Sequence, residues 1–142
     1  MNGRFLLDTA IAGLLSRDDP AVRQKLAPAL EFFVPVFALA ELEFGALYYQ
    51  ILHGTPKHIN RYAAFLAAHG HRLLYTDLDT SIPRYLDTSH IYAAIAALLK
   101  ATGKPMQSND IWIAALAQQH GLTVLTKDTD FQRITGLSVE VM

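Results

Sequence analysis

The sequence contains no cysteine, which excludes both a disulfide framework and a thiolate metal site. A reducing cytoplasm is therefore the compartment that fits best. Charged residues are also scarce, at 18% of 142 residues against 51% hydrophobic ones, and no Pro, Ser or Gly tract is long enough to act as a linker. This balance is typical of a chain that buries a core, so we expect one folded domain over residues 1–142.

Several motifs of nucleotide- and metal-binding proteins are missing too. The sequence has no GxGxxG loop, no GxxxxGKS or GxxxxGKT loop, no HExxH and no recognisable serine-triad context. Its first apolar run is short and interrupted by Asp8, which argues against a secretory signal or a membrane span. A formal net charge of -1 argues against binding nucleic acid through a dense basic surface. An enzyme that acts on RNA with a few local cations and a metal ion stays compatible with this charge.

Short apolar runs alternate with helical patterns along the chain. Strands are predicted at residues 4–7, 32–36, 72–75 and 123–125, with an edge strand at 137–141. Helices are predicted at residues 9–16, 20–30, 37–52, 57–68, 81–101 and 111–120, and Pro28 should bend or end the second of them. The helix over 37–52 is apolar on nearly every face, which predicts burial on several sides. Alternating strands and helices predict an α/β fold, in which helices cover both faces of a parallel sheet and a site forms at the strand C-terminal ends.

Two acids follow predicted strands. Asp8 comes after the apolar run at residues 5–7, and Asp128 comes soon after the strand at 123–125. Each has a simple structural alternative, because Asp8 is a good N-cap for the helix that follows and Asp128 can form an Asx turn.

Two further acids lie in a predicted helix or just before one. Glu41 has apolar neighbours at the i−4, i−3, i+3 and i+4 positions, so its carboxylate should be paired with a buried Arg or Lys, protonated or bound to metal. Asp110 precedes an apolar helix and competes with Ser108 and Asn109 as its cap. Three acids at element ends and one in a helix can converge at one edge of a parallel sheet, and converging like charges need a divalent cation.

Four segments, taken in order, strengthen this interpretation. FLLDT at 5–9, ALAELEFGA at 38–46, SNDIWIAALA at 108–117 and LTKDTDF at 125–131, followed by ITGLSVE, resemble the successive motifs of PIN-domain ribonucleases, specifically the VapC-type toxins. The resemblance covers almost the whole chain. It implies a PIN-like compact α/β/α sandwich with a short, mainly parallel sheet of four to five strands. One departure is Ala10, which stands where the family usually has Asn or Ser.

By position, the resemblance assigns the family's metal-binding acids to Asp8, Glu41, Asp110 and Asp128, with Asp130 as a supporting acid. It implies an endoribonuclease that uses Mg²⁺ or Mn²⁺ and leaves a 5′-phosphate and a 3′-hydroxyl. It also implies a homodimer and a small antitoxin protein that occupies the acidic site and a neighbouring apolar groove. Candidate groove residues share the helix at 37–52: Phe44, Tyr48, Tyr49 and Leu52. Candidate phosphate contacts lie near the acidic motifs: Lys104, Lys127 and Arg133.

Three alternatives remain beside this hypothesis. The protein could keep the fold without catalysis and bind RNA or a protein partner, although four intact acids argue against this. The segment 77–79, Asp-Leu-Asp after an apolar run, is similar to the nucleophile motif of haloacid-dehalogenase-type phosphatases, but too few residues follow it. Trp112 and the six tyrosines could stack on bases, although their helical settings favour packing in a core or a dimer.

Overall fold

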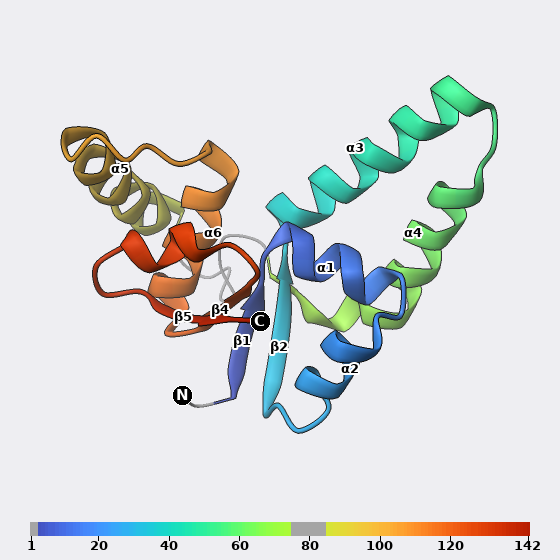
Figure 1. Ribbon diagram of the computed structural model, residues 1–142, viewed down its shortest axis with the longest axis horizontal. Coiled ribbons are helices and arrows are strands. Elements are labelled where there is room, and N and C mark those ends of the chain that lie inside the picture. The colour runs from blue at the N-terminus through green and yellow to red at the C-terminus, as the bar shows by residue number, and fades with distance from the viewer. Residues whose placement is uncertain (1–2, 75–84) are drawn as a thin grey trace.

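The computed structural model describes residues 3–74 and 85–142 (Figure 1). Its strands are β1 (Arg4–Leu7), β2 (Glu31–Pro35), β3 (Leu73–Leu74), β4 (Thr123–Thr126) and β5 (Ser138–Val141). Its helices are α1 (Thr9–Ser16), α2 (Pro20–Leu26), α3 (Val36–His53), α4 (Lys57–His69), α5 (Tyr85–Ala101) and α6 (Ser108–His120), with 3₁₀ turns at η1 (Gly70–Arg72) and η2 (Thr129–Arg133).

The five strands form one sheet in the order β3-β2-β1-β4-β5, and every neighbouring pair is parallel. β1 lies at the centre, where Phe5 is in register with Phe32 of β2 and Leu6 with Val124 of β4. Parallel strands need crossover connections, which here are helices. The predicted sheet, its parallel sense and the edge strand at the C-terminus are therefore confirmed.

The two faces of the sheet carry separate cores because side chains alternate along each strand. Phe5 and Leu7 of β1 point into one core, which α1 to α4 complete. Leu6, between them, belongs to the other core, which α5 and α6 complete. The chain is thus an α/β/α sandwich, as its alternating sequence pattern predicts.

Most predicted boundaries agree with the structure within a few residues. α2 ends at Leu26, before Pro28, so it is shorter than predicted. Gly121 ends α6 in the left-handed conformation at φ 65°, as a helix-terminating glycine should. Gly70 does not end α4 in this left-handed conformation, because its φ of -55° is right-handed and the chain continues into η1. The predictions for residues 75 and 81–84, and the motif at 77–79, lie outside the described residues.

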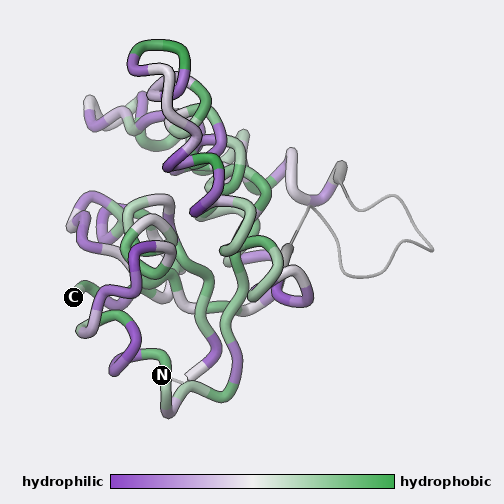
Figure 2. Tube along the Cα trace, turned by 90° about the vertical axis from the view of Figure 1, so that its right-hand side faces the viewer, coloured by the Kyte–Doolittle hydropathy of each residue, from purple (hydrophilic) through white to green (hydrophobic). Residues whose placement is uncertain are grey.

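The prediction of a helix buried on several sides is wrong for α3. Only its first half packs against the sheet, where Ala38 and Leu39 are buried. Figure 1 shows that α3 and α4 continue as a helical hairpin away from the sheet, so the second half of α3 has few partners. Phe44 and Ile51 are 70% and 80% exposed. Figure 2 shows hydrophobic residues, in green, at the top of the molecule, where Figure 1 places the end of α3.

Aromatic packing is confirmed at Trp112. Its ring stacks on Tyr92 of α5 at 4.0 Å between ring centroids and on Phe37 of α3 at 5.8 Å. These contacts tie α3, α5 and α6 together beside the strand ends. Within residues 3–74 and 85–142, no helix is long and apolar enough to cross a membrane.

Candidate active site

The carboxyl ends of β1 and β4 lie side by side at one edge of the sheet. Leu7 is in register with Leu125, and the backbone N–H of Asp8 donates to the carbonyl oxygen of Leu125 at 3.2 Å. Asp8 therefore continues the ladder for one residue before α1 begins. Asp128 follows β4 by two residues, so the fold delivers two acids that are far apart in sequence to the same edge.

Asp8 is 5% exposed and is held by two hydrogen bonds. Its Oδ1 accepts the N–H of Ile11 at 2.9 Å, which caps α1, and its Oδ2 accepts the hydroxyl of Thr126. Burial raises the pKa of Asp8 above its ordinary 3.8, with a further contribution from the negative charge of Asp128, while the Thr126 and Ile11 hydrogen bonds oppose the rise. The capping role and a place in an acidic site are therefore combined in one side chain.

Asp110 is the acid most affected by its neighbours. Its pKa is raised from 3.8 to about 6, first by burial and then, in decreasing order, by the charges of Asp8, Glu41, Asp128 and Asp130. It is not the cap of its helix, because α6 starts at Ser108 and Asp110 lies in the first turn. Four acids from three segments of the chain thus act on one carboxyl group.

Glu41 lies in the first half of α3 and is half-buried. Its Oε1 accepts the Nδ2–H of Asn109 at 2.6 Å, which links α3 to the start of α6. Within the described residues neither Arg nor Lys forms an ion pair with it, so the alternative of a buried cationic partner is not supported there. The apolar surroundings expected from sequence are also reduced, because Phe44 points into solvent.

The acids after β4 are more exposed. Asp128 accepts the N–H of Asp130 at 2.8 Å and so forms the predicted Asx turn, while its own N–H donates to the Thr126 hydroxyl oxygen at 2.8 Å. Asp130 pairs with Arg133 at 2.9 Å. Among the candidate phosphate contacts, Lys104 and Lys127 are exposed, and Arg133 is occupied by this ion pair.

The donor chemistry of this edge fits a hard divalent cation, because carboxylate oxygens are the ligands that Mg²⁺ and Mn²⁺ prefer. Over residues 3–74 and 85–142, however, no three His, Asp or Glu side chains lie close enough together to form a complete metal-binding group. Mg²⁺ usually keeps several waters and uses one or two protein carboxylates, so a loose group of acids is compatible with it. The metal ligand set stays a prediction.

Two polar residues at this edge were not identified from sequence as part of the site. Thr126 contacts both Asp8 and the backbone of Asp128, and Asn109 holds Glu41. Both stand inside quoted motifs, SND and LTKDTD, but only their pairing across the fold reveals what they do. The sequence signal for Thr126 and Asn109 was that each is a polar residue close to an acid of a motif.

The candidate acids lie where the strands of a parallel α/β sheet end, which is the place where such folds bind their ligands. The family model described as PIN domain matches residues 5–137, and the chain belongs to this family. The resemblance stated from the motifs is thereby confirmed.

The curated relatives are named as ribonucleases. The chain is 36% identical to ribonuclease VapC5 of Mycobacterium tuberculosis over 67 residues, 46% of this chain and 49% of that protein. It spans about half the length of that relative. It is 27% identical to ribonuclease VapC4 of the same organism over 109 residues, 77% of this chain and 75% of VapC4.

A solved structure gives a longer match. The fold is similar to VapBC-5 of Mycobacterium tuberculosis, a member of the VapBC family of toxin-antitoxin systems, with a TM-score of 0.67. The two chains are 27% identical, and the match covers 99% of this chain and 98% of the other. Fold and motif order therefore agree with a VapC-type PIN domain.

Proposed function

We propose that this protein is a metal-dependent endoribonuclease, the toxin of a toxin–antitoxin pair, with Asp8, Glu41, Asp110 and Asp128 as its catalytic acids. The observation that supports this most directly is the raised pKa of Asp110, to which the charges of four other carboxylates contribute after burial, the largest cause. Such a group of like charges is a poor RNA site until a cation balances it. The ribonuclease names of the relatives indicate the substrate class.

A Mg²⁺ or Mn²⁺ ion held by these carboxylates would supply an activated water and would neutralise charge on the phosphoryl oxygens. The residues of the chain set the geometry for that chemistry. Thr126 fixes the Asp8 carboxylate by donating to Oδ2, and Asn109 fixes Glu41 by donating to Oε1. Lys104 and Lys127 are exposed cations that can contact phosphate, whereas Arg133 would first have to leave Asp130.

We also propose an antitoxin partner and a homodimer. The exposed apolar side chains on the second half of α3 are a large uncovered surface for a monomer. They include Phe44, Leu47, Tyr48, Ile51 and Leu52. The structural relative comes from a toxin–antitoxin system, which supports a protein partner for this chain.

The test is cleavage of total cellular RNA by the purified protein. We expect cleavage with Mg²⁺ or Mn²⁺, none in EDTA, and none by the Asp110→Asn variant with metal present. The cleaved ends should carry a 5′-phosphate and a 3′-hydroxyl. Full activity in chelator or 2′,3′-cyclic phosphate ends would refute the proposal, and a metal-loaded protein that binds RNA without cutting it would indicate a binding module instead.

A further inference from the structure

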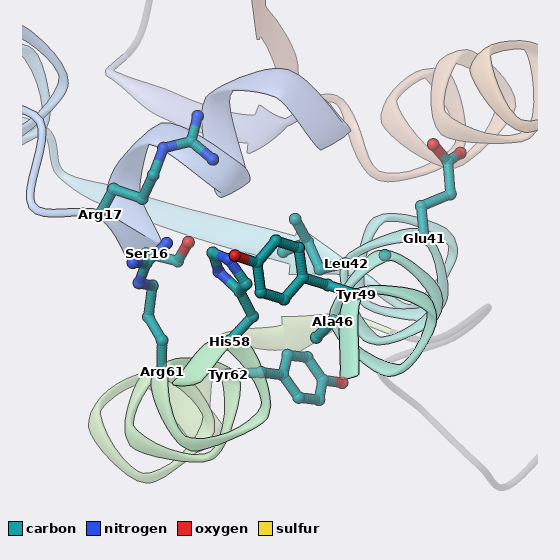
Figure 3. A pocket seen from close by; sticks show the side chains of 10 residues that line it. Ser16, Arg17, Glu41, Leu42, Ala46, Tyr49, His58, Arg61 and Tyr62 are labelled. Carbon is teal, nitrogen blue, oxygen red and sulfur yellow. The ribbon is translucent and has the colours of Figure 1, made fainter. Parts of the chain in front are cut away.

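A pocket of about 310 Å³ lies between the end of α1, α3 and the first half of α4 (Figure 3). Its size falls near the lower end of small-molecule sites, which span roughly 300–1,000 Å³. Figure 3 shows Glu41 at one end, with its carboxylate turned away from the other labelled side chains. The other lining residues are of two kinds: basic or aromatic ones, Arg17, Arg61, His58, Tyr49 and Tyr62, and small or aliphatic ones, Ser16, Leu42, Gly45 and Ala46.

The two arginines of this pocket lack acidic partners. Within residues 3–74 and 85–142, neither Arg17 nor Arg61 forms an ion pair with a carboxylate. Both also border an adjoining pocket, to which Asp18 contributes the acidic residue. The local field is positive: burial and the nearby charges of Arg61, Lys57 and Arg17 hold the pKa of His58 below 6.5. Two arginines that line a pocket and have no carboxylate partner among the described residues are suited to binding an anion.

The aromatic wall is held in place by its own contacts. The Tyr49 ring meets His58 edge-on at 4.1 Å between centroids, with an interplanar angle of 84°, and lies 4.3 Å from His53. These contacts join α3 to α4 and restrict the tyrosine before any ligand arrives. A fixed aromatic ring beside unpaired cations is the combination with which proteins bind single-stranded nucleic acid, the ring for a base and the cations for the backbone.

The pocket and the candidate active site share one residue of α3. Glu41 lines the pocket and also accepts from Asn109 at the acidic edge, so this residue belongs to both places. Glu41 and Tyr49 are separated by about two helical turns, or ~12 Å along the helix axis. A single strand whose scissile phosphate lies at the acids can therefore run along α3 and reach the arginines with a neighbouring nucleotide.

We propose that this pocket is an RNA subsite, in which Arg17 and Arg61 bind a backbone phosphate beside the cleavage position and Tyr49 stacks on a base. The inference rests on the proposed ribonuclease function. It adds where the protein binds the part of the RNA that lies outside the acidic edge. Neither arginine contacts the reacting phosphate, so both act as substrate-positioning residues.

The test measures binding of a short fluorescein-labelled single-stranded RNA in EDTA, where no metal-dependent cleavage interferes, over a range of salt concentrations. Arg17→Gln combined with Arg61→Gln should weaken binding at least about tenfold and lower the slope of log Kd against log salt by about 0.7 to 1.4, for one or two lost phosphate contacts. Tyr49→Leu should weaken binding about fivefold or more and leave the slope unchanged. On an RNA that the parent cleaves, the double variant should raise KM while kcat changes by less than about twofold.

Two controls separate this subsite from general effects. Arg23→Gln removes an exposed cation of α2 that does not line the pocket and should leave affinity and slope unchanged. Replacing both pocket arginines with Lys keeps the charges and should restore the slope, and thermal melts verify that each variant is folded. If the Gln pair fails to fold, the Lys pair and Tyr49→Leu still test the phosphate and stacking contacts separately.

The outcomes are distinct. If the parent cleaves RNA and the Gln variants have the same affinity, salt slope and KM as the parent, the subsite is overturned and the proposed function stands. That result would favour a protein ligand for the pocket. An Arg23→Gln effect equal to that of the pocket pair also overturns it. A parent that neither binds nor cleaves RNA refutes the proposed function and the subsite together.

Discussion

Asp110→Asn should make the metal-free protein more stable at neutral pH, although it removes a proposed catalytic acid. The pKa of the Asp110 carboxyl is raised from 3.8 to about 6, so between these values the folded state holds a proton that the unfolded state has released. Stability of the parent therefore falls as pH rises through this window, and the unfavourable contribution is complete above about pH 6. The amide of Asn carries no charge and is free of this contribution.

The size of the effect follows from the pKa rise. At about 1.4 kcal/mol for each pKa unit the rise corresponds to at most about 3 kcal/mol. Asp110 is only half-buried, so solvent screening reduces this to about 1–2 kcal/mol. For a chain of this size we expect a melting temperature roughly 3–6 °C above that of the parent at about pH 7.5, and little difference near pH 4.

The assay is thermal unfolding of both proteins in EDTA at the two pH values, repeated near neutral pH with excess Mn²⁺. Mn²⁺ should stabilise the parent more than the variant, because a ligand that binds only the folded state adds stability in proportion to its occupancy. Asp18→Asn removes an exposed acid away from the acidic edge and controls for the loss of one negative charge. A variant that is destabilised equally at both pH values, or that gains as much at pH 4 as at neutral pH, would refute the electrostatic argument.

Three further predictions concern the neighbours of Asp110. Asp8→Asn should remain folded, because Asn also caps helices, but should lose RNA cleavage in the total-RNA assay; normal cleavage would remove Asp8 from the site. Glu41→Gln should match or exceed the parent's melting temperature in EDTA and gain less from Mn²⁺, since no cationic partner is left unpaired within the described residues; a large loss that does not depend on metal would contradict this. Thr126→Val should lower the free energy of unfolding, measured by chemical denaturation, by about 1–3 kcal/mol, because Asp8 loses a buried hydrogen bond and the N–H of Asp128 loses its acceptor. In the same variant the acidic limb of the pH–activity profile should move to higher pH. An unchanged denaturation midpoint would show that these two bonds contribute nothing.

Sequence alone was sufficient for the elements that local pattern controls. The strand at β1 and the end of α6 at residue 120 are confirmed, because apolar periodicity and a left-handed glycine such as Gly121 act over a few residues. It also predicted that Asp8 and Asp128 would share an edge, since the carboxyl ends of parallel strands meet there. The order of the motifs then indicated the family.

Only the tertiary structure decided what each polar group contacts. Asn109 and Thr126 join residues from distant segments, and such pairings depend on how α3, α6, β1 and β4 are placed together. The apolar composition of α3 predicted burial, but burial requires a partner, and the second half of this helix extends beyond the sheet. The raised pKa of Asp110 has the same origin, because desolvation and the charges of four separated acids exist only once the chain is folded.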